Sequence, residues 1–511
     1  MEAPPAAPPE LEELRARLGE LRDLRGVEQV LTWDQNTFMP PGGSETRAQQ
    51  LGTVERLIHS KLVDPGLVRV LDALEPWAHE LDPDSDEACL VRFTRRDQEK
   101  ALRVPASLAE AMALEAARAY TDWLAAREAG DYARFRDSIA RQVELRHQYA
   151  ACFPEAGHPY DVLLDDFEPG ATTAELRPLF AELVARLQPL VDAAARPDLE
   201  PNGGVFLGRF DVEEQRRAVV AILRHVGFEE QHWRLDATPH PFAQSPGPGD
   251  YRLTTRYSET DFSFVLYSSL HEFGHGLYDA GLPASLARTP LHDCASLGVH
   301  ESQSRTWENF VGRSRPFCAW LLPRLRELLP GRFDGLDADA MFGAVNTVQR
   351  SLVRTESDET TYNLHVALRF ELELALLEGT IDATGLPDAW NEGMARLVGV
   401  EVTSDAEGVL QDVHWGIGAF GYFPTYSLGN LMAAQMWRRV RADLTDLDDQ
   451  IERGEFAPLT EWLRENVHRH GRKLRPRELL QRVTGEPLRV DPLLDYLTTK
   501  LAAAGFLAPG S

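Results

Sequence analysis

The feature that most constrains this chain is the motif HEFGH at residues 271–275. On an α-helix, side chains four residues apart lie one above the other, so His271 and His275 would point the same way. Two such imidazoles supply half of a tetrahedral zinc site, and Glu272 would lie beside the metal as a general base that activates water. Apolar spacing around the motif, with Gly281 and Pro283 as a stop signal, predicts a helix here. The motif therefore predicts a hydrolytic zinc site.

A zinc hydrolase needs a third protein ligand and leaves its fourth position open. Glu301, in the segment HESQ at residues 300–303, lies 26 residues after His275. A carboxylate at this distance fits a second helix that crosses the first, so we favour Glu301 as the third ligand, with His300 and Glu308 as alternatives. The metzincin pattern requires a histidine a few residues after a glycine, and residues 276–280 read GLYDA instead.

Length and composition favour a large folded enzyme. Of the 511 residues, 43% are hydrophobic, which is enough for a sizeable core. A chain of this length usually folds into several domains, but large helical enzymes often form one continuous body. We expect a single peptidase unit over residues 1–511. Within it, residues 1–9 would form a flexible tail, 10–230 a mostly helical cover and 231–511 the catalytic core.

Charge and cysteine usage exclude several classes of partner. The net charge is −27 and no basic run occurs, so neither nucleic acid nor an anionic membrane surface is an expected partner. The four cysteines are widely spaced and read as reduced thiols. Residues 1–9 lack the features of a signal peptide, and no segment reads as membrane-spanning. These observations predict a cytoplasmic protein.

Helical periodicity dominates the chain, with one interruption before the HEFGH motif. Segments Gln231–Thr238 and Asp250–Tyr257 alternate as short strands, joined by a predicted loop at Phe242–Gly249. An edge strand at this place can hold an extended peptide by main-chain hydrogen bonds. We therefore predict a mainly α fold with a small β-sheet beside the HEFGH helix. The expected helices are Leu11–Val30, Ser44–Lys61, Asp64–Trp77, one beginning near Glu87, Ser107–Glu128, Asp131–Cys152, Thr172–Arg196, Asp211–Gly227, Pro316–Leu329, Asp337–Leu352, Ser357–Leu377, Pro387–Val398, Pro424–Leu444, Leu459–Val467 and Pro476–Val483.

Several further motifs occur in a fixed order along the chain. They are HPF at 240–242, DYRLT at 250–254, HEFGH at 271–275, HESQ at 300–303 and GVLQDVHW at 408–415, with WDQ at 33–35, MPPG at 39–42 and TYNLH at 361–365. Together they resemble the metallocarboxypeptidases of peptidase family M32, the carboxypeptidase Taq family. One departure lies at Ser357, where the family more usually has alanine.

The resemblance implies a large helical zincin-type metallopeptidase with a deep groove. It also implies a divalent metal, normally zinc with cobalt as a substitute, and release of single residues from peptide C-termini with broad specificity. Members are usually homodimers. Residue by residue, His271, His275 and Glu301 match the metal ligands, and Glu272 matches the catalytic glutamate.

Hydrolysis of a peptide bond also needs a donor for the oxyanion. His414, with Tyr422 and Tyr426 eight and twelve residues later, is the candidate donor cluster. The two tyrosines are four residues apart and would share a helical face if the turn at Pro424 allows it. The alternative is that they are core aromatics with satisfied hydroxyls.

An exopeptidase must recognise a free α-carboxylate, which calls for a cation of fixed geometry. Arg354 matches the family's arginine in its segment, and Arg350 would lie one helical turn earlier. Arg252 is a third candidate, and the motif of His240 belongs to the expected closed end of the groove. For Asp279, one turn past His275, a role as acceptor for an imidazole N–H and a place at an exposed helix end are both open.

Two other functions fit parts of this pattern. A metal-dependent oligopeptidase of the same helical type would use the same four central residues, although the motifs at His240 and Asp250 favour an exopeptidase. A non-catalytic peptide-binding scaffold would have no need of Glu272.

Overall fold

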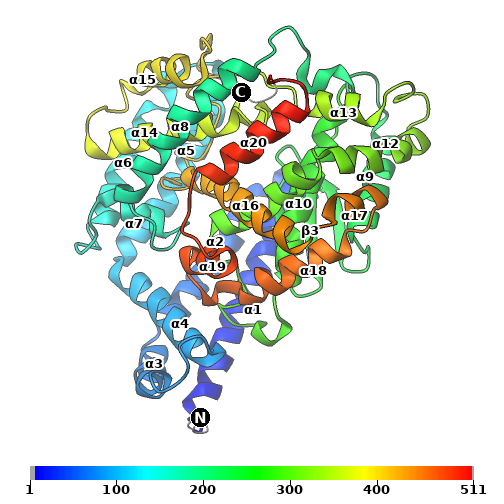
Figure 1. Cartoon of the computed structure of the whole chain (residues 1–511). Coiled ribbons are helices and arrows are strands. Elements are labelled where there is room, and N and C mark those ends of the chain that lie inside the picture. The colour runs from blue at the N-terminus through cyan, green and yellow to red at the C-terminus, as the bar shows by residue number, and fades with distance from the viewer. Residues whose placement is uncertain (1–5, 509–511) are drawn as a thin grey trace.

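The structure is a computed structural model that describes residues 6–508, so the first five residues of the expected tail lie outside it. Its helices pack around a central pair, α10 and α16, while α3, α4 and the start of α1 project from one end of the body (Figure 1). The helices before the sheet are α1 (Glu10–Thr37), α2 (Ser44–Leu62), α3 (Pro65–Ala78), α4 (Asp86–Arg103), α5 (Ala106–Ala129), α6 (Arg136–Ala150), α7 (Pro159–Asp165), α8 (Thr173–Ala194) and α9 (Val212–Val226).

The second half of the chain is also helical. Its helices are α10 (Ser263–Gly281), α11 (Leu297–Arg305), α12 (Arg315–Leu328), α13 (Ala338–Val345), α14 (Tyr362–Glu378), α15 (Leu386–Gly393), α16 (Pro424–Asp443), α17 (Leu447–Arg453), α18 (Ala457–Asn466), α19 (Pro476–Thr484) and α20 (Asp491–Ala503). The predicted mainly α fold with a small sheet is therefore confirmed. None of the helices in the described range 6–508 is long and apolar enough to cross a membrane.

The sheet has three strands, β1 (Trp233–Ala237), β2 (Ala243–Gly247) and β3 (Asp250–Thr255), in the order β1-β3-β2. Strand β3 pairs in parallel with β1 and antiparallel with β2. The prediction that residues 242–249 form only a loop was wrong. Proline and glycine in this segment favoured a turn, but the segment pairs with β3 as a strand. Its ladder is irregular between Gln244 and Gly247, and this irregularity lets Pro246 lie in the strand although proline has no N–H to donate.

Several predicted helix boundaries were also wrong. The helix expected to end at Val30 continues to Thr37, and the one expected from Asp131 begins at Arg136 after a short 3-10 turn.

Two further errors have identifiable local reasons. The helix expected over 337–352 ends at Val345, where the Asn346 amide donates to the Phe342 carbonyl at 2.8 Å. The helix expected from Ser357 begins at Tyr362 instead. Before it, the Asp358 carboxylate accepts the Thr360 amide N–H at 2.8 Å, which favours a turn over a helix. Helices α7, α17 and α20 were not predicted.

Close helix crossings hold α10 and α11 in place. Gly274 on α10 lies so near α11 that an added Cβ would come within 2.6 Å of the Gln303 carbonyl oxygen. Beside this crossing, Phe273 packs against Trp233 and Trp307, with ring centroids 5.2 and 5.7 Å away. Full burial of a side chain like Phe273 stabilises a fold by roughly 1.5–3 kcal/mol. This packing fixes the separation between the histidine-bearing helix and the one that carries Glu301.

Candidate metal centre and active site

Three candidate ligand atoms meet between α10 and α11. The Nε2 atoms of His271 and His275 lie 3.2 Å apart, and each lies 3.6 Å from Glu301 Oε2. Tetrahedral zinc with ligand bonds of about 2.0–2.2 Å separates its ligand atoms by about 3.3–3.6 Å. Both the donor types and their spacing therefore fit a zinc ion. Among the described residues, this is the group of histidine, cysteine and carboxylate side chains close enough to share a metal, and the alternatives His300 and Glu308 are not part of it.

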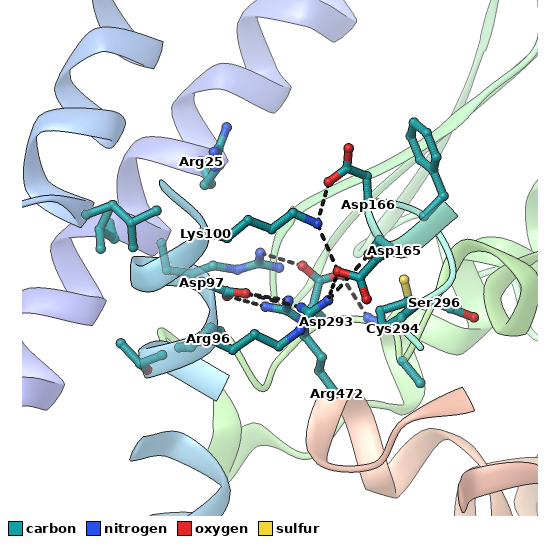
Figure 2. Close-up of a pocket in the computed structure, with 18 of the residues that line it drawn as sticks. Arg25, Arg96, Asp97, Lys100, Asp165, Asp166, Asp293, Cys294, Ser296 and Arg472 are labelled. Atoms are coloured by element: carbon teal, nitrogen blue, oxygen red, sulfur yellow. Dashed lines mark hydrogen bonds and ion pairs between the residues drawn. The ribbon is translucent and has the colours of Figure 1, made fainter. Parts of the chain in front are cut away.

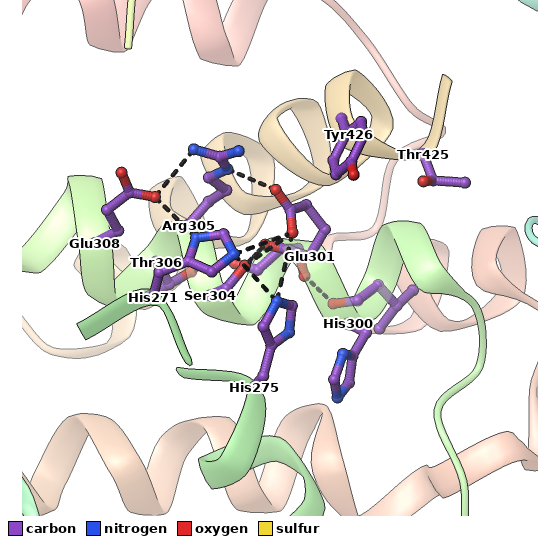
Figure 3. A network of polar contacts seen from close by, with 12 residues as sticks. His271, His275, His300, Glu301, Ser304, Arg305, Thr306, Glu308, Thr425 and Tyr426 are labelled. Atoms are coloured by element: carbon purple, nitrogen blue, oxygen red, sulfur yellow. Dashed lines mark hydrogen bonds and ion pairs between the residues drawn. The ribbon is translucent and has the colours of Figure 1, made fainter. Parts of the chain in front are cut away.

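Glu308 contacts the candidate ligand His271 through the ring nitrogen that does not face the other two candidate ligands. Its Oε2 is 2.9 Å from His271 Nδ1, and Arg305 Nη1 donates to the same carboxylate at 3.0 Å (Figure 3). Burial alone would lower the pKa of His271, but Glu301 and Glu308 outweigh it and raise that pKa. Burial opposes ionisation of Glu308, yet Arg305 and His271 lower its pKa to about 2. Glu308 is therefore an ionised acceptor that orients the His271 ring.

His300 turns away from the three ligand atoms. Its Nε2 lies 3.3 Å from Asp279 Oδ1, and its ring stacks on His275 with centroids 4.3 Å apart. Asp279 is therefore an acceptor for an imidazole, as one alternative held, but the imidazole is that of His300. Ser245 on β2 donates to the same carboxylate at 2.5 Å, which ties the sheet to the site.

Glu272 is 6% exposed and shares its surroundings with the candidate ligands. Burial raises its pKa to about 7, with His271 acting in the opposite direction. A carboxyl whose pKa lies near neutrality can both take up and release a proton under working conditions.

The three candidate oxyanion donors also come together. His414 Nε2 lies 3.2 Å from the Tyr426 hydroxyl, and the Tyr422 and Tyr426 rings are 5.3 Å apart, although Tyr422 precedes α16. Tyr426 extends from α16 toward Glu301 (Figure 3). Burial lowers the pKa of His414 to about 4, raises that of Tyr422 to about 12 and raises that of Tyr426 well above its usual value. Both tyrosines therefore stay protonated and can donate hydrogen bonds at neutral pH.

Arg354 lies beside these tyrosines, with its guanidinium carbon 4.8 Å from the Tyr426 ring centroid. It is buried, donates to Asp412 Oδ1 at 2.8 Å and donates to the Tyr362 hydroxyl at 2.7 Å. Arg369, also buried, donates to the other oxygen of Asp412 at 2.7 Å. Two buried guanidinium groups thus share one carboxylate, which leaves a surplus positive charge beside the tyrosines. A buried surplus charge of this kind is costly unless an anion joins it.

The other substrate-binding candidates lie elsewhere. Arg350 is bonded to Asp192 and to the Val398 carbonyl, and because the helix ends before it, the expected one-turn relation to Arg354 is wrong. Arg252 is paired with Asp250 of its own strand and lies 4.5 Å over the Trp33 ring. His240 is exposed in the segment between β1 and β2.

Sequence reasoning missed several residues that build the site. Arg305 lies four residues after Glu301, a spacing that signals a helical ion pair. Arg369 bonds to Asp412 from 43 residues away, and no local pattern reveals it. Tyr362 lies within the TYNLH motif, but the motif alone does not indicate its bond to Arg354. Gly429 on α16 faces Glu301, with an added Cβ only 2.6 Å from Glu301 Cγ, and its role also depends on tertiary packing.

A separate cavity of about 440 Å³ lies between α1, α4 and the segment that leads into α11. None of the candidate ligands lines it. Charged side chains on its walls are paired with each other, as in Arg96 with Asp165 at 2.7 Å and Arg472 with Asp97 at 2.5 Å (Figure 2). These pairs join the projecting N-terminal helices to the body and leave little free charge for a ligand.

Comparison with known proteins covers nearly the whole chain. Residues 13–501 match the family model described as "Carboxypeptidase Taq (M32) metallopeptidase". "Thermostable carboxypeptidase 1" of Thermus thermophilus is 43% identical over 489 residues, which cover 94% of this chain and 96% of that protein. "Carboxypeptidase 1" of Bacillus subtilis is 36% identical over 92% of this chain and 94% of that protein. The crystal structure of the M32 carboxypeptidase from Deinococcus radiodurans R1 has a TM-score of 0.92 and 40% identity, and covers 97% of this chain and 99% of that chain.

Proposed function

The chain belongs to the carboxypeptidase Taq (M32) family of metallopeptidases, and we propose that it is a zinc-dependent carboxypeptidase that releases single C-terminal residues with broad specificity. One observation carries this proposal. The candidate ligands His271, His275 and Glu301 lie next to Glu272. The surplus positive charge around Arg354 lies beside Tyr426, which extends toward Glu301 (Figure 3). A metal site that cuts and a cationic site for a free carboxylate are what an exopeptidase requires.

The chain's own groups divide the chemistry between them. A bound zinc or cobalt ion would supply Lewis acidity and lower the pKa of water from near 16 to about 7. Glu272, buried beside the candidate ligands, would accept the proton of the attacking water and later deliver it to the leaving amine. The pair of Tyr426 and His414, which are hydrogen-bonded to each other at 3.2 Å, would supply the donor for the oxyanion.

Substrate recognition falls to Arg354 in this proposal. The α-carboxylate of a peptide would join Asp412 in compensating the two buried arginines. Arg354 packs against Tyr426 and Tyr362, and Tyr426 extends toward the candidate ligand Glu301 (Figure 3). This proximity would place the last peptide bond beside the metal ligands and so restrict cleavage to the C-terminus.

Three organisational proposals accompany the function, of which the homodimer rests on the family resemblance and the other two on the sequence itself. The chain would act as a single peptidase unit, with residues 10–230 as cover and 231–511 as catalytic core. We further propose that it works in the cytoplasm and as a homodimer, with unblocked peptides as its partners.

Mass spectrometry of peptide digests tests the function. A peptide with a free C-terminus should lose one residue at a time, and both its C-terminally amidated copy and a chelated sample should stay intact. Internal cleavage, or equal cleavage of the amidated copy, would favour the oligopeptidase. No cleavage of any peptide by the metal-loaded protein would favour the binding scaffold.

A further inference from the structure

Four side chains around the candidate metal centre form a closed ring of contacts (Figure 3). Arg305 Nε donates to Glu301 Oε1 at 2.7 Å, and Arg305 Nη1 donates to Glu308 Oε2 at 3.0 Å. Glu308 Oε2 in turn lies 2.9 Å from His271 Nδ1. The ring closes where His271 Nε2 lies 3.6 Å from Glu301 Oε2.

Arg305 is the member of the ring that donates a hydrogen bond to each of the two carboxylates. It is buried at the end of α11, with its guanidinium carbon 4.4 Å from the Tyr362 ring centroid. The rigid, planar fork of an arginine can hold two carboxylates at a fixed angle, whereas a lysine ammonium cannot. Its fixed position therefore sets the orientation of the candidate ligand Glu301 and also of Glu308, the carboxylate that contacts His271.

The contacts on Glu301 divide its two oxygens between different tasks. Arg305 occupies Oε1, while Oε2 faces the imidazoles and accepts a hydrogen bond from Ser304 Oγ at 3.1 Å. The charge-assisted hydrogen bond from Arg305 to Oε1 holds the carboxylate with Oε2 turned toward both imidazoles, so Oε2 is the oxygen that Glu301 presents to a metal. One oxygen from Glu301 and one nitrogen from each histidine leave the fourth position of a tetrahedral site open.

The local backbone supports this arrangement. The segment Thr306–Val311, directly after α11, is a π-helix, and Glu308 lies within it. A π-helical turn is wider than an α-helical one and occurs frequently at functional sites. Here it carries Glu308 to the side of Arg305 and into reach of His271.

We propose that Arg305 is a positioning residue that keeps Glu301 a one-oxygen ligand and, through Glu308, fixes the rotation of the His271 ring. This inference rests on the proposed function, because it assumes that the trio binds a divalent metal. Loss of Arg305 would free Oε1, so that Glu301 could bind the metal through both oxygens, and would release Glu308 from its place beside His271.

The test uses cobalt(II) titration of the metal-free full chain, followed by its visible absorption. Arg305→Gln should bind cobalt 10- to 100-fold more weakly, the range typical when a group behind a metal ligand is lost. Its d–d absorption should also weaken, because a higher coordination number lowers the intensity of these bands. Arg305→Lys should rescue only part of the affinity, since one ammonium cannot bridge both carboxylates.

A matched control separates the ring from general damage to the fold. Arg313, on the same stretch of chain, is partly buried, lies 3.8 Å over the Tyr267 ring and donates to the Val345 carbonyl at 2.8 Å. Arg313→Gln therefore removes a guanidinium of the same neighbourhood that bonds to none of the ring's side chains, and it should leave the cobalt affinity and spectrum unchanged. Thermal unfolding in chelator shows which variants are folded. If Arg305→Gln does not fold, Arg305→Lys and Glu308→Gln carry the test.

The possible failures are distinguishable. If the wild-type chain binds no cobalt at these residues, the proposed function fails and the inference falls with it. If the wild-type chain binds one cobalt ion, and folded Arg305 variants match the Arg313 control in affinity and spectrum, the role of Arg305 is overturned while the metal site stands.

Discussion

Gly429 on α16 lies directly against Glu301 on α11, so that a Cβ at position 429 would come within 2.6 Å of Glu301 Cγ and 2.7 Å of its Cβ. The same added atom would meet the Gly298 carbonyl oxygen at 3.1 Å. A glycine is required at this crossing because any side chain would occupy the space of the candidate ligand. The position of the Glu301 carboxylate thus depends on a helix that contributes none of the candidate metal ligands.

Gly429→Ala should therefore weaken metal binding by displacing Glu301. We expect at least a tenfold loss of zinc affinity, together with an overpacking cost of about 1–3 kcal/mol in the free energy of unfolding. Competition with a chromophoric chelator measures the affinity, and denaturant unfolding in excess chelator measures the stability. Gly52→Ala on α2 is the matched control, because a Cβ there meets no atom within 4 Å. Wild-type zinc affinity in folded Gly429→Ala would contradict this prediction.

Glu272→Gln should keep the fold and the metal but lose nearly all turnover. An amide cannot accept the water's proton, and general acid–base groups typically contribute 10²–10⁴-fold in rate, roughly 3–5 kcal/mol of barrier. The kcat of single-residue release and the zinc content per chain should be measured on one preparation. A zinc-loaded variant with wild-type kcat would show that another group is the base.

Arg354→Ala should raise KM strongly for peptides with a free C-terminus. Loss of a desolvated, charge-assisted contact should cost about 2–4 kcal/mol in kcat/KM, with some loss of kcat as the scissile bond is held less well. Any residual cleavage of amidated peptides should hardly change, and Arg354→Lys should rescue only partly. Arg350→Ala is the control, because Arg350 is bonded to Asp192 and Val398 instead. An equal loss for free and amidated peptides would make Arg354 structural.

Acid should destabilise the fold through His468. This ring is buried, bonds to Gln303 through Nε2 at 2.9 Å, and has its pKa lowered by burial to about 3. The fold favours the neutral ring, so the stability it contributes is present above the unfolded pKa of about 6.5 and is lost as the pH falls toward the folded pKa. Between pH 7 and 4.5, this ring alone should cost about 2–3 kcal/mol.

His468→Gln removes the titrating ring but keeps a hydrogen-bond donor. In excess chelator, denaturant unfolding of this variant should show a shallower loss of stability between pH 7 and 4.5 than the wild type shows. His79→Gln, at an exposed position, should retain the wild-type slope. Identical slopes for all three proteins would rule out His468 as a source of acid sensitivity.

Local periodicity predicted much of this molecule. The helix with His271 and His275 was predicted because a 3.6-residue repeat of apolar side chains marks a buried helical face. Glu301 was favoured from its distance to that helix, and the structure brings its carboxylate to the two imidazoles. In each of these cases the signal lies within a few turns of one helix or in the length of one connection.

What escaped prediction depends on contacts between distant segments. Strand β2 reads as a turn because of Pro246 and Gly247, and only pairing with β3 makes it a strand. Arg350 was placed near Arg354 because a side-chain-capped helix end at Asn346 was not recognised. The sharing of Asp412 between Arg354 and Arg369 joins residues that no short motif connects.

The central claim is that one metal ion, held by His271, His275 and Glu301, is required for release of C-terminal residues. Titration of the metal-free chain with zinc tests it most directly, with bound metal and peptide release followed in the same samples. We predict that activity rises in proportion to bound zinc and levels off at one ion per chain. Full activity in a sample verified to be free of metal would contradict the account.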